Sequence, residues 1–317
     1  MEKLAVITSK EVGTPNLSRL KGLYNISYSV NSSIQEALHG ASAAFLWDAS
    51  LIDELKRHWN WMQDVKWLHA AVTGIDELCF EELRNSDIIL TNAGGIYDNA
   101  VAEYTLAACL NYERCFNKLR DQQLAHEWKW LQGSALRGKN ILIVGPGRIG
   151  RTCARLFHVF RCKVAALGSE HKNDSNLFAF YESSSEAQRY VGWADHIIVT
   201  APLTTGTYHL VNTSILAACK NTAHIVNVGR GSIVDTQALV DALASKQIGG
   251  ATLDVLEEEP LASDSPLWDL ENVTITPHIA GDVGNFERAL ITQFIGNARA
   301  WAQGDALECI VDKNRGY

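Results

Sequence analysis

Residues 141–150 read I-L-I-V-G-P-G-R-I-G and join an apolar strand directly to the start of a helix. The run 141–144 is apolar and mostly β-branched, the composition of a strand buried on both faces. Three glycines follow at G-x-G-x-x-G spacing, and apolar residues at helical period continue over 152–160. A glycine motif between a strand and a helix predicts a dinucleotide-binding turn; the simpler alternative is a tight turn that binds nothing.

Each residue of that turn has a distinct expected task. Gly145 makes the tight turn, Gly147 lets the backbone approach a pyrophosphate, and Gly150 lets the helix pack close to the strand. The helix N-terminus offers N–H groups and the positive end of the helix dipole. We therefore expect the backbone of Arg148 and Ile149 to meet the pyrophosphate of a bound dinucleotide.

Composition narrows the class of protein. At 317 residues the chain is long enough for about two domains, and its net charge of −8 gives no electrostatic support for nucleic-acid binding. No apolar run approaches the ~18 residues that span a bilayer, and the start lacks a signal-peptide layout. Seven cysteines are scattered without a C-x-x-C pair, and ten histidines lack zinc-like spacing. We expect a cytoplasmic protein with reduced core cysteines, no membrane partner and no metal site.

Short apolar runs alternate with helical segments along the chain, which predicts parallel, doubly wound α/β sheets. In the N-terminal third, strands without a glycine-rich loop indicate a flavodoxin-type half; they are 4–8, 44–47, 67–71 and 88–92. The strands expected around the glycine motif are 141–144, 164–167, 196–200, 223–228, 251–255 and 273–276. Helices are predicted at 32–38, 50–58, 99–116, 236–245 and 285–303.

The last predicted helix follows the final strand of the second half, so it can cross back to the first half. We therefore expect an α/β fold of two Rossmann-like or flavodoxin-like domains with parallel sheets. In this prediction a nucleotide-binding domain, residues 97–284, is inserted into a discontinuous substrate domain, residues 1–96 and 285–317.

Polar residues gather just beyond three predicted strand ends, in 227–231, 254–260 and 276–281. Ligands of open α/β sheets bind at such ends. Arg230 can grip a carboxylate bidentately and polarise a carbonyl, and His278 can donate a proton because histidine titrates near ~6.5. A neighbouring glutamate can orient the imidazole. The set suits hydride transfer to a 2-keto acid; the alternatives are a structural histidine, a surface ion pair and a solvated acidic turn.

Several longer motifs match one family in order and spacing. They are V-G-P-G-R-I-G (144–150), N-V-G-R-G-S-I-V-D (227–235), G-A-T-L-D-V-L-E-E-E-P-L (250–261), S-P-L-W (265–268) and T-P-H-I-A-G (276–281). Weaker matches are A-A-V-T-G-I-D (70–76), N-A-G-G-I-Y-D-N-A-V-A-E-Y (92–104) and A-P-L-T-T-G-T (201–207). The chain resembles the D-isomer-specific 2-hydroxyacid dehydrogenases over nearly its whole length.

The resemblance implies roles for individual residues. It assigns the catalytic arginine to Arg230, the acid/base histidine to His278, and the partner glutamate to Glu259, which directly precedes the proline. It also implies that Asp254 binds the nicotinamide carboxamide. Backbone N–H groups that would hold the substrate carboxylate belong to Val72, Thr73 and Gly74. Further cofactor contacts fall on Pro202, Thr207 and Val228.

Two features resemble the glyoxylate/hydroxypyruvate reductase A-like branch: the ending 311–317 and the segment Leu46-Trp47-Asp48. Trp47 could cover a small substrate or simply be a core aromatic at a strand end. The branch implies reduction of glyoxylate or hydroxypyruvate to the D-2-hydroxy acid, and the family implies a homodimer formed through the nucleotide domain. A different function within the same family is a nucleotide-sensing interaction protein of the corepressor type, with little turnover.

The cofactor is predicted from the end of the strand after the glycine motif, where an acidic residue would bind an NAD ribose. Gly168 stands there instead, and Gly168-Ser169 leaves room for a 2′-phosphate. His171 and Lys172 could supply positive charge, whereas Glu170 would repel a phosphate. The sequence therefore favours NADP, with NAD as the alternative.

Overall fold

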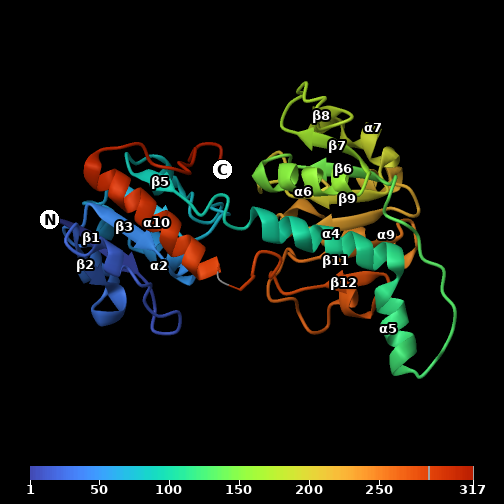
Figure 1. Cartoon of the computed structure of the whole chain (residues 1–317), viewed down its shortest axis with the longest axis horizontal. Coiled ribbons are helices and arrows are strands. Elements are labelled where there is room, and N and C mark those ends of the chain that lie inside the picture. The colour runs from blue at the N-terminus through green and yellow to red at the C-terminus, as the bar shows by residue number, and fades with distance from the viewer. Residues whose placement is uncertain (285, 317) are drawn as a thin grey trace. The chain divides into compact units, whose positions relative to one another are not determined.

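The computed structural model describes residues 1–284 and 286–316, and its chain divides into two compact units. One unit holds Met1–Tyr97 together with Val283–Tyr317, and the other holds Asp98–Asp282. Asn285, the expected first residue of the last helix, and Tyr317, the last residue of the ending 311–317, lie outside the described residues. Figure 1 shows a sheet with helices in each unit.

The first unit is built on a five-stranded parallel sheet with the order β2-β1-β3-β4-β5. Its strands are β1 Glu2–Ile7, β2 Tyr24–Tyr28, β3 Ala43–Leu46, β4 Trp67–Ala70 and β5 Ile89–Thr91. Its helices are α1 Ile34–Leu38, α2 Ile52–Arg57, α3 Glu81–Arg84 and α10 Phe286–Gln303. The edge strand β2 was not expected, because only Tyr24 in it is buried and the apolar signal is weak.

Helix α10 packs on the sheet of the first unit, although the whole second unit, Asp98–Asp282, lies between them in the sequence. The ring of Phe294 stacks on Phe45 with the centroids 3.8 Å apart, and it also stacks on Trp67. The hydroxyl of Tyr24 donates to the carbonyl of Ala298 at 2.6 Å. Aromatic stacking and a buried hydrogen bond therefore fix the returning chain on β2, β3 and β4.

The second unit is built on a seven-stranded parallel sheet with the order β12-β11-β10-β9-β6-β7-β8. Its strands are β6 Asn140–Val144, β7 Lys163–Gly168, β8 Tyr181–Ser183, β9 His196–Val199, β10 His224–Asn227, β11 Gly250–Leu253 and β12 Val273–Ile275. Its helices are α4 Asp98–Arg114, α5 Phe116–Leu124, α6 Arg148–Val159, α7 Ala187–Tyr190, α8 Thr213–Ala218 and α9 Thr236–Ala244. The prediction of two parallel α/β sheets is confirmed.

Two expectations need adjustment in this unit. The edge strand β8 is only three residues long, too short for a periodic signal. The predicted helix 99–116 is two helices, because Cys115 adopts a left-handed φ of 55° that ends α4 and precedes α5. No helix among the described residues is both long and apolar enough to cross a membrane.

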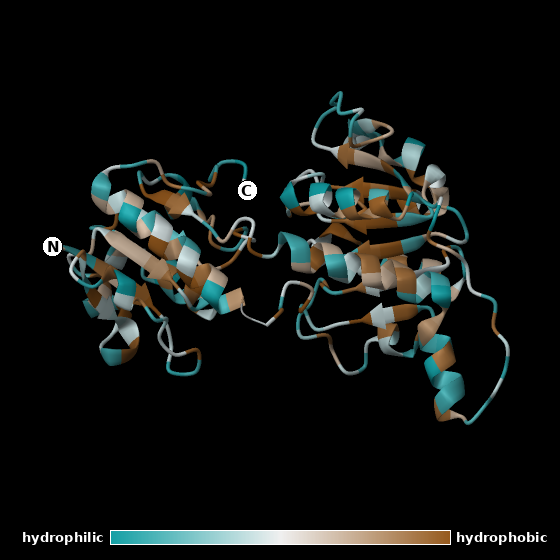
Figure 2. Cartoon of the chain, viewed as in Figure 1, coloured by the Kyte–Doolittle hydropathy of each residue, from teal (hydrophilic) through white to brown (hydrophobic). Residues whose placement is uncertain are grey.

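Successive side chains of β6 point to opposite faces of the second sheet and contribute to the core on each face. Ile141 and Ile143 belong to the core that includes Phe157 of α6, whereas Leu142 and Val144 belong to the core on the other face, with α8 and α9. Figure 2 shows the strands as mainly hydrophobic and the helices as mixed. All parallel strands end at one edge, so the loops after them share that edge.

The glycine turn after β6 depends on close backbone contacts. Gly145 has a φ of +93°, and a Cβ there would lie 2.3 Å from the Cα of Ala201. A Cβ on Gly150 would lie 2.6 Å from the Gly145 carbonyl oxygen, so α6 packs tightly on β6. Gly147 differs, since nothing lies within 4 Å of the place its Cβ would take. The fold therefore requires Gly145 and Gly150 but not Gly147.

This contrast predicts different effects of alanine on stability. Gly145→Ala should lower the free energy of unfolding by about 2–4 kcal/mol, because the methyl group meets backbone and φ is positive. Gly147→Ala is the matched control and should cost less than about 1 kcal/mol, as expected at a helix N-cap. Urea unfolding followed by circular dichroism measures both. Equal unfolding midpoints for the two variants would contradict the packing argument.

Candidate active site

Arg230 lies in a loop after β10 that is fixed by backbone contacts. The buried Asn227 accepts a hydrogen bond from the N–H of Gly229 at 3.1 Å and donates to the carbonyl of Arg230 at 3.0 Å. A Cβ on Gly229 would lie 2.8 Å from the Ala201 carbonyl oxygen, and one on Gly231 would overlap the backbone of Leu256. The two glycines let the loop touch its neighbours, and the guanidinium donates to the Gly229 carbonyl at 2.8 Å.

The side chains of His278 and Glu259 contact each other in this region. The imidazole Nδ1 lies 2.9 Å from Glu259 Oε2, and the other carboxylate oxygen accepts from the N–H of Leu256 at 2.9 Å. An ionised carboxylate only accepts hydrogen bonds, so Nδ1 carries the proton of this contact. Nε2 is then the nitrogen that can give or take a proton. Both side chains are solvent-accessible, with 54% of His278 exposed.

The loop that carries His278 is anchored by Asp254, which follows β11 and is only 3% exposed. One carboxylate oxygen accepts from the Thr276 hydroxyl at 2.5 Å and from the N–H of Ile279 at 2.9 Å. The other accepts from the N–H of Ala280 at 2.9 Å. The N–H of His278 also donates to the Asp254 carbonyl, and His278 itself has a left-handed φ of 54°. Asp254 therefore fixes the backbone that presents the imidazole.

Two residues of this anchor were not expected from the sequence. The hydroxyls of Tyr104 and Thr276 lie 2.6 Å apart, which ties helix α4 to the histidine loop. Burial raises the pKa of Tyr104, so its hydroxyl stays protonated. Tyr104 lies in the motif 92–104 and Thr276 in the motif 276–281. Membership in these motifs was the signal in the sequence that could have identified them.

The three consecutive glutamates have different contacts. Glu257 binds His209 Nε2 at 2.5 Å and the N–H of Thr236 at 2.9 Å, so it links to the start of α9. Burial acts to raise its pKa, but the hydrogen bonds from Thr236 and His209 outweigh burial and lower it. Glu258 is exposed. Among these three side chains, the structure brings Glu259 to His278.

Several of the residues expected to bind the nucleotide lie at the ends of β6, β9 and β10. Arg148 is exposed at the start of α6 and contacts Asp98 at 3.4 Å, while Ile149 is half-buried. The Thr207 hydroxyl donates to the Pro202 carbonyl at 2.7 Å and so closes the turn after β9. The backbone N–H of Val228 donates a hydrogen bond to the Val199 carbonyl. Gly147 leaves open space at the N-terminus of α6, so this turn fits a pyrophosphate.

The segment after β7 corrects one detail of the cofactor prediction. A Cβ on Gly168 would lie 2.6 Å from the ring of Tyr181, so the room attributed to this glycine is filled by that side chain. Ser169 is exposed. Lys172 pairs with Glu170 at 3.2 Å, and His171 lies 3.0 Å from Glu182. These exposed pairs are weak and can exchange for a phosphate.

The expected substrate contacts lie in the first unit, after β3 and β4. Trp47 is half-buried and packs against Phe45 at a centroid distance of 5.5 Å. The Val72 carbonyl accepts from the N–H of Ala93, and the Thr73 hydroxyl donates to the Ala93 carbonyl. Gly74, next in this loop, is half-buried. The structure therefore holds the loop 72–74 by its carbonyl and hydroxyl groups.

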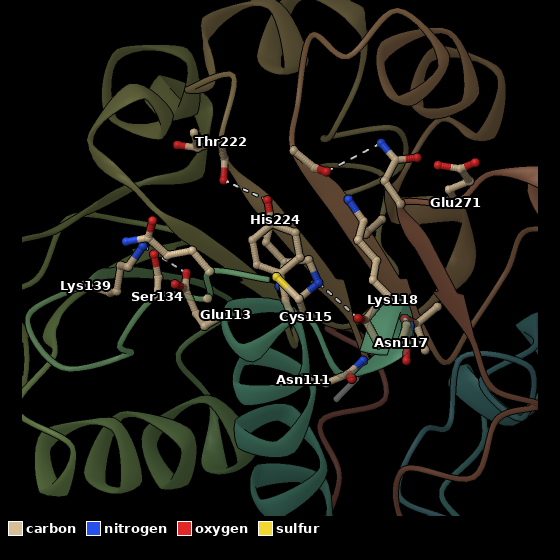
Figure 3. A pocket seen from close by; sticks show the side chains of 18 residues that line it. Asn111, Glu113, Cys115, Asn117, Lys118, Ser134, Lys139, Thr222, His224 and Glu271 are labelled. Carbon is tan, nitrogen blue, oxygen red and sulfur yellow. Dashed lines mark hydrogen bonds and ion pairs between the residues drawn. The ribbon is translucent and has the colours of Figure 1, made fainter. Parts of the chain in front are cut away.

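A cavity of about 340 Å³ lies elsewhere in the second unit (Figure 3). Its walls include Tyr112, Glu113, Lys139, His224 and Thr252. Because His224 begins β10, the cavity lies toward the amino-terminal edge of the sheet, away from the loops just described. Among the described residues, none of the predicted site residues lines it.

Comparisons with known proteins agree on one family. The family described as "D-isomer specific 2-hydroxyacid dehydrogenase, NAD binding domain" matches residues 106–280. A glyoxylate reductase of Thermofilum pendens is 32% identical over 256 residues, 79% of this chain and 76% of that protein. An (S)-sulfolactate dehydrogenase of Chromohalobacter salexigens is 35% identical over 220 residues, 69% of this chain and 71% of that protein.

A solved structure agrees over the whole length of the chain. A D-isomer-specific 2-hydroxyacid dehydrogenase family protein of Aeromonas salmonicida superposes with a TM-score of 0.84 at 26% identity, covering 99% of this chain and 100% of that one. The relatives, the matched nucleotide domain and the shared fold lead to one conclusion: the chain belongs to the D-isomer-specific 2-hydroxyacid dehydrogenase family.

Proposed function

We propose that the protein reduces a small 2-keto acid of the glyoxylate or hydroxypyruvate type to the D-2-hydroxy acid, with NADPH as the preferred cofactor. The pairing of His278 with Glu259 on a loop anchored by Asp254 carries this proposal. That loop follows β12 and lies at the same edge of the sheet as the glycine turn after β6. An acid and a nucleotide-binding turn at one edge suit hydride and proton addition to a carbonyl.

In this mechanism the side chains divide the work. His278 gives the proton on Nε2 to the developing alkoxide, and Glu259 holds the imidazole through Nδ1 and stabilises its charged form. Arg230 grips the substrate carboxylate and polarises the carbonyl. In the first unit, we propose Trp47 and the backbone N–H groups of the loop 72–74 as substrate contacts. The reduced nicotinamide supplies the hydride.

Support for the cofactor comes from the second unit. Gly147 has open space beside its Cα, and the first N–H groups of α6 have no partner within the helix. Asp254 accepts three hydrogen bonds, and a carboxylate has about four acceptor sites, so one remains for the nicotinamide carboxamide. Gly168 stands at the end of β7 in place of the acidic residue that would bind an NAD ribose, and this, with His171 and Lys172 nearby, favours NADP.

We also propose that the protein is a cytoplasmic homodimer. All seven cysteines are free, as expected in a reducing compartment. Large apolar side chains are exposed on α5 and the segment after it: Phe116, Leu124, Trp128 and Trp130, the last two at 102% and 83%. Exposed tryptophans of this kind are typical of an interface, and a second copy of the chain is the partner we propose.

The catalytic roles predict a graded loss of turnover. His278→Gln should lower kcat by about 10²–10⁴-fold while NADPH binding persists, because proton donation is lost. Glu259→Gln should lower kcat less, since the amide oxygen still accepts from Nδ1 but carries no charge. Glu258→Gln, at the exposed neighbour, is the control and should change neither value.

Loss of NADPH absorbance with glyoxylate and hydroxypyruvate follows the reaction, and pyruvate, sulfopyruvate and longer 2-keto acids complete the panel. Full turnover by His278→Gln would refute its role as the acid. Tight NADPH binding by the unaltered protein without turnover of any acid would instead indicate a nucleotide sensor of the corepressor type.

Cofactor preference should depend on charge after β7. Replacing Ser169 and Lys172 with acidic residues should lower the ratio of kcat/KM with NADPH to that with NADH by tenfold or more, about 1.4 kcal/mol. The control is Lys163→Glu, which reverses the charge of a lysine, as the replacement of Lys172 does, at the exposed start of β7. An unchanged ratio in the double variant would contradict the NADP assignment.

The homodimer has its own test. Trp128→Ser combined with Trp130→Ser should shift the protein from dimer to monomer in sedimentation equilibrium, because these side chains supply buried apolar area to the interface. Val12→Ser, at an exposed apolar residue of the first unit, should leave the dimer intact. A monomeric unaltered protein, or a dimer that survives both tryptophan replacements, would exclude this interface.

A further inference from the structure

Polar side chains meet inside the second unit at a place that the proposed reaction does not use. Cys109 and Glu113 lie one turn apart on α4 and face the first residues of β9 and β10, His196 and His224. The two histidines are direct neighbours in the register of these strands. Thr252 of β11 completes the group. All five are buried, with exposed fractions of 5% or less.

The ring nitrogens of the two histidines point at each other. The distance from His196 Nδ1 to His224 Nδ1 is 3.1 Å. His196 Nε2 lies 3.0 Å from Glu113 Oε1, and His224 Nε2 lies 3.0 Å from the Thr252 hydroxyl. In each imidazole the outer nitrogen, Nε2, contacts Glu113 or Thr252. The inner nitrogen, Nδ1, faces the other histidine.

Glu113 holds the His196 ring so that its Nδ1 faces His224. Lys139 Nζ lies 3.0 Å from Glu113 Oε1. Burial acts to raise the pKa of Glu113, but His196 and Lys139 outweigh burial and lower it, so the carboxylate accepts the proton of His196 Nε2. The outer nitrogens of His196 and His224 are thus occupied by Glu113 and Thr252, and both Nδ1 atoms lie on the inner side of the group.

We propose that Cys109, His196 and His224 bind a transition-metal ion of the zinc type through Sγ and the two Nδ1 atoms. One ligand atom from each of the three residues lies within 4.8 Å of the others. A tetrahedral zinc ion places N and S ligands about 3.4–3.6 Å apart, so a shift of about 1 Å closes the set. Thiolate and imidazole are the ligands that zinc-type ions prefer.

The contacts beyond these three ligands also fit a metal site. A histidine that binds metal usually donates its other N–H to a carboxylate or another acceptor, which fixes the ring. Glu113 takes that place for His196, and the Thr252 hydroxyl takes it for His224. When the ion binds, the His224 proton moves from Nδ1 to Nε2, and the Cys109 thiol loses its proton to solvent.

The cavity of about 340 Å³ gives the ion a route from solvent, because His224, Glu113 and Thr252 line it. Figure 3 shows His224, Lys139 and Glu113 at its wall, with Lys139 beside Glu113. The Tyr112 ring stacks on His224 with the centroids 4.2 Å apart, which holds the imidazole in place. The ion would clamp α4 to β9 and β10, near the edge of the sheet opposite the proposed active site.

Cobalt(II) tests the site in the full-length protein without an affinity tag. Added Co²⁺ should give a thiolate-to-cobalt charge-transfer band that saturates at one equivalent, and Zn²⁺ should displace it. Cys109→Ser should abolish the band, and His224→Gln should weaken Co²⁺ binding at least tenfold. Cys153→Ser is the matched control, since Cys153 is equally buried in the same core, and it should keep the band.

Thermal unfolding gives a second readout. Zn²⁺ should raise the Tm of the unaltered protein and of Cys153→Ser, but not of Cys109→Ser, because only an intact site binds the folded state. The proposal is overturned if the unaltered protein shows no charge-transfer band at saturating Co²⁺, a result that needs no variant to fold. It is also overturned if the band persists in Cys109→Ser. Neither readout depends on keto-acid turnover.

Discussion

The buried carboxylate of Asp254 is the contact on which the proposed chemistry depends. It accepts three hydrogen bonds from the loop 276–280 and keeps His278 in a left-handed conformation that few side chains adopt. Tyr104 extends this anchor to α4 through Thr276. An exposed imidazole held by its own backbone can meet substrate without losing its orientation toward Glu259. In the proposed mechanism, the acid is therefore placed by a residue that does not itself react.

Close backbone approaches at glycines position the other loops at that edge of the sheet. Gly145 and Gly229 both approach the backbone of Ala201, and Gly231 touches Leu256, so the loops after β6, β9, β10 and β11 support one another. Glycine at these places is a packing requirement of the protein itself. Gly147 is the exception, because nothing lies within 4 Å of the place its Cβ would take. The same motif thus contains glycines that the fold requires and one that it does not.

The opposite edge of the same sheet shows a different use of buried polar groups. Two histidines occupy the starts of β9 and β10, and their ring nitrogens contact Glu113, Thr252 and each other. Buried polar groups of this kind are costly unless every partner is in place. A metal ion among Cys109, His196 and His224 would give this arrangement a purpose apart from the keto-acid chemistry.

The sequence by itself determined the parallel α/β architecture, the glycine turn and the segments that carry the proposed catalytic side chains, because periodicity and motif spacing are local properties. It missed β2 and β8, which are edge strands with weak apolar signals. Only the tertiary structure decided that Tyr181 fills the space beside Gly168, and that Cys109, His196 and His224 meet. Strand register and helix packing join residues far apart in the chain, and no local pattern encodes that proximity.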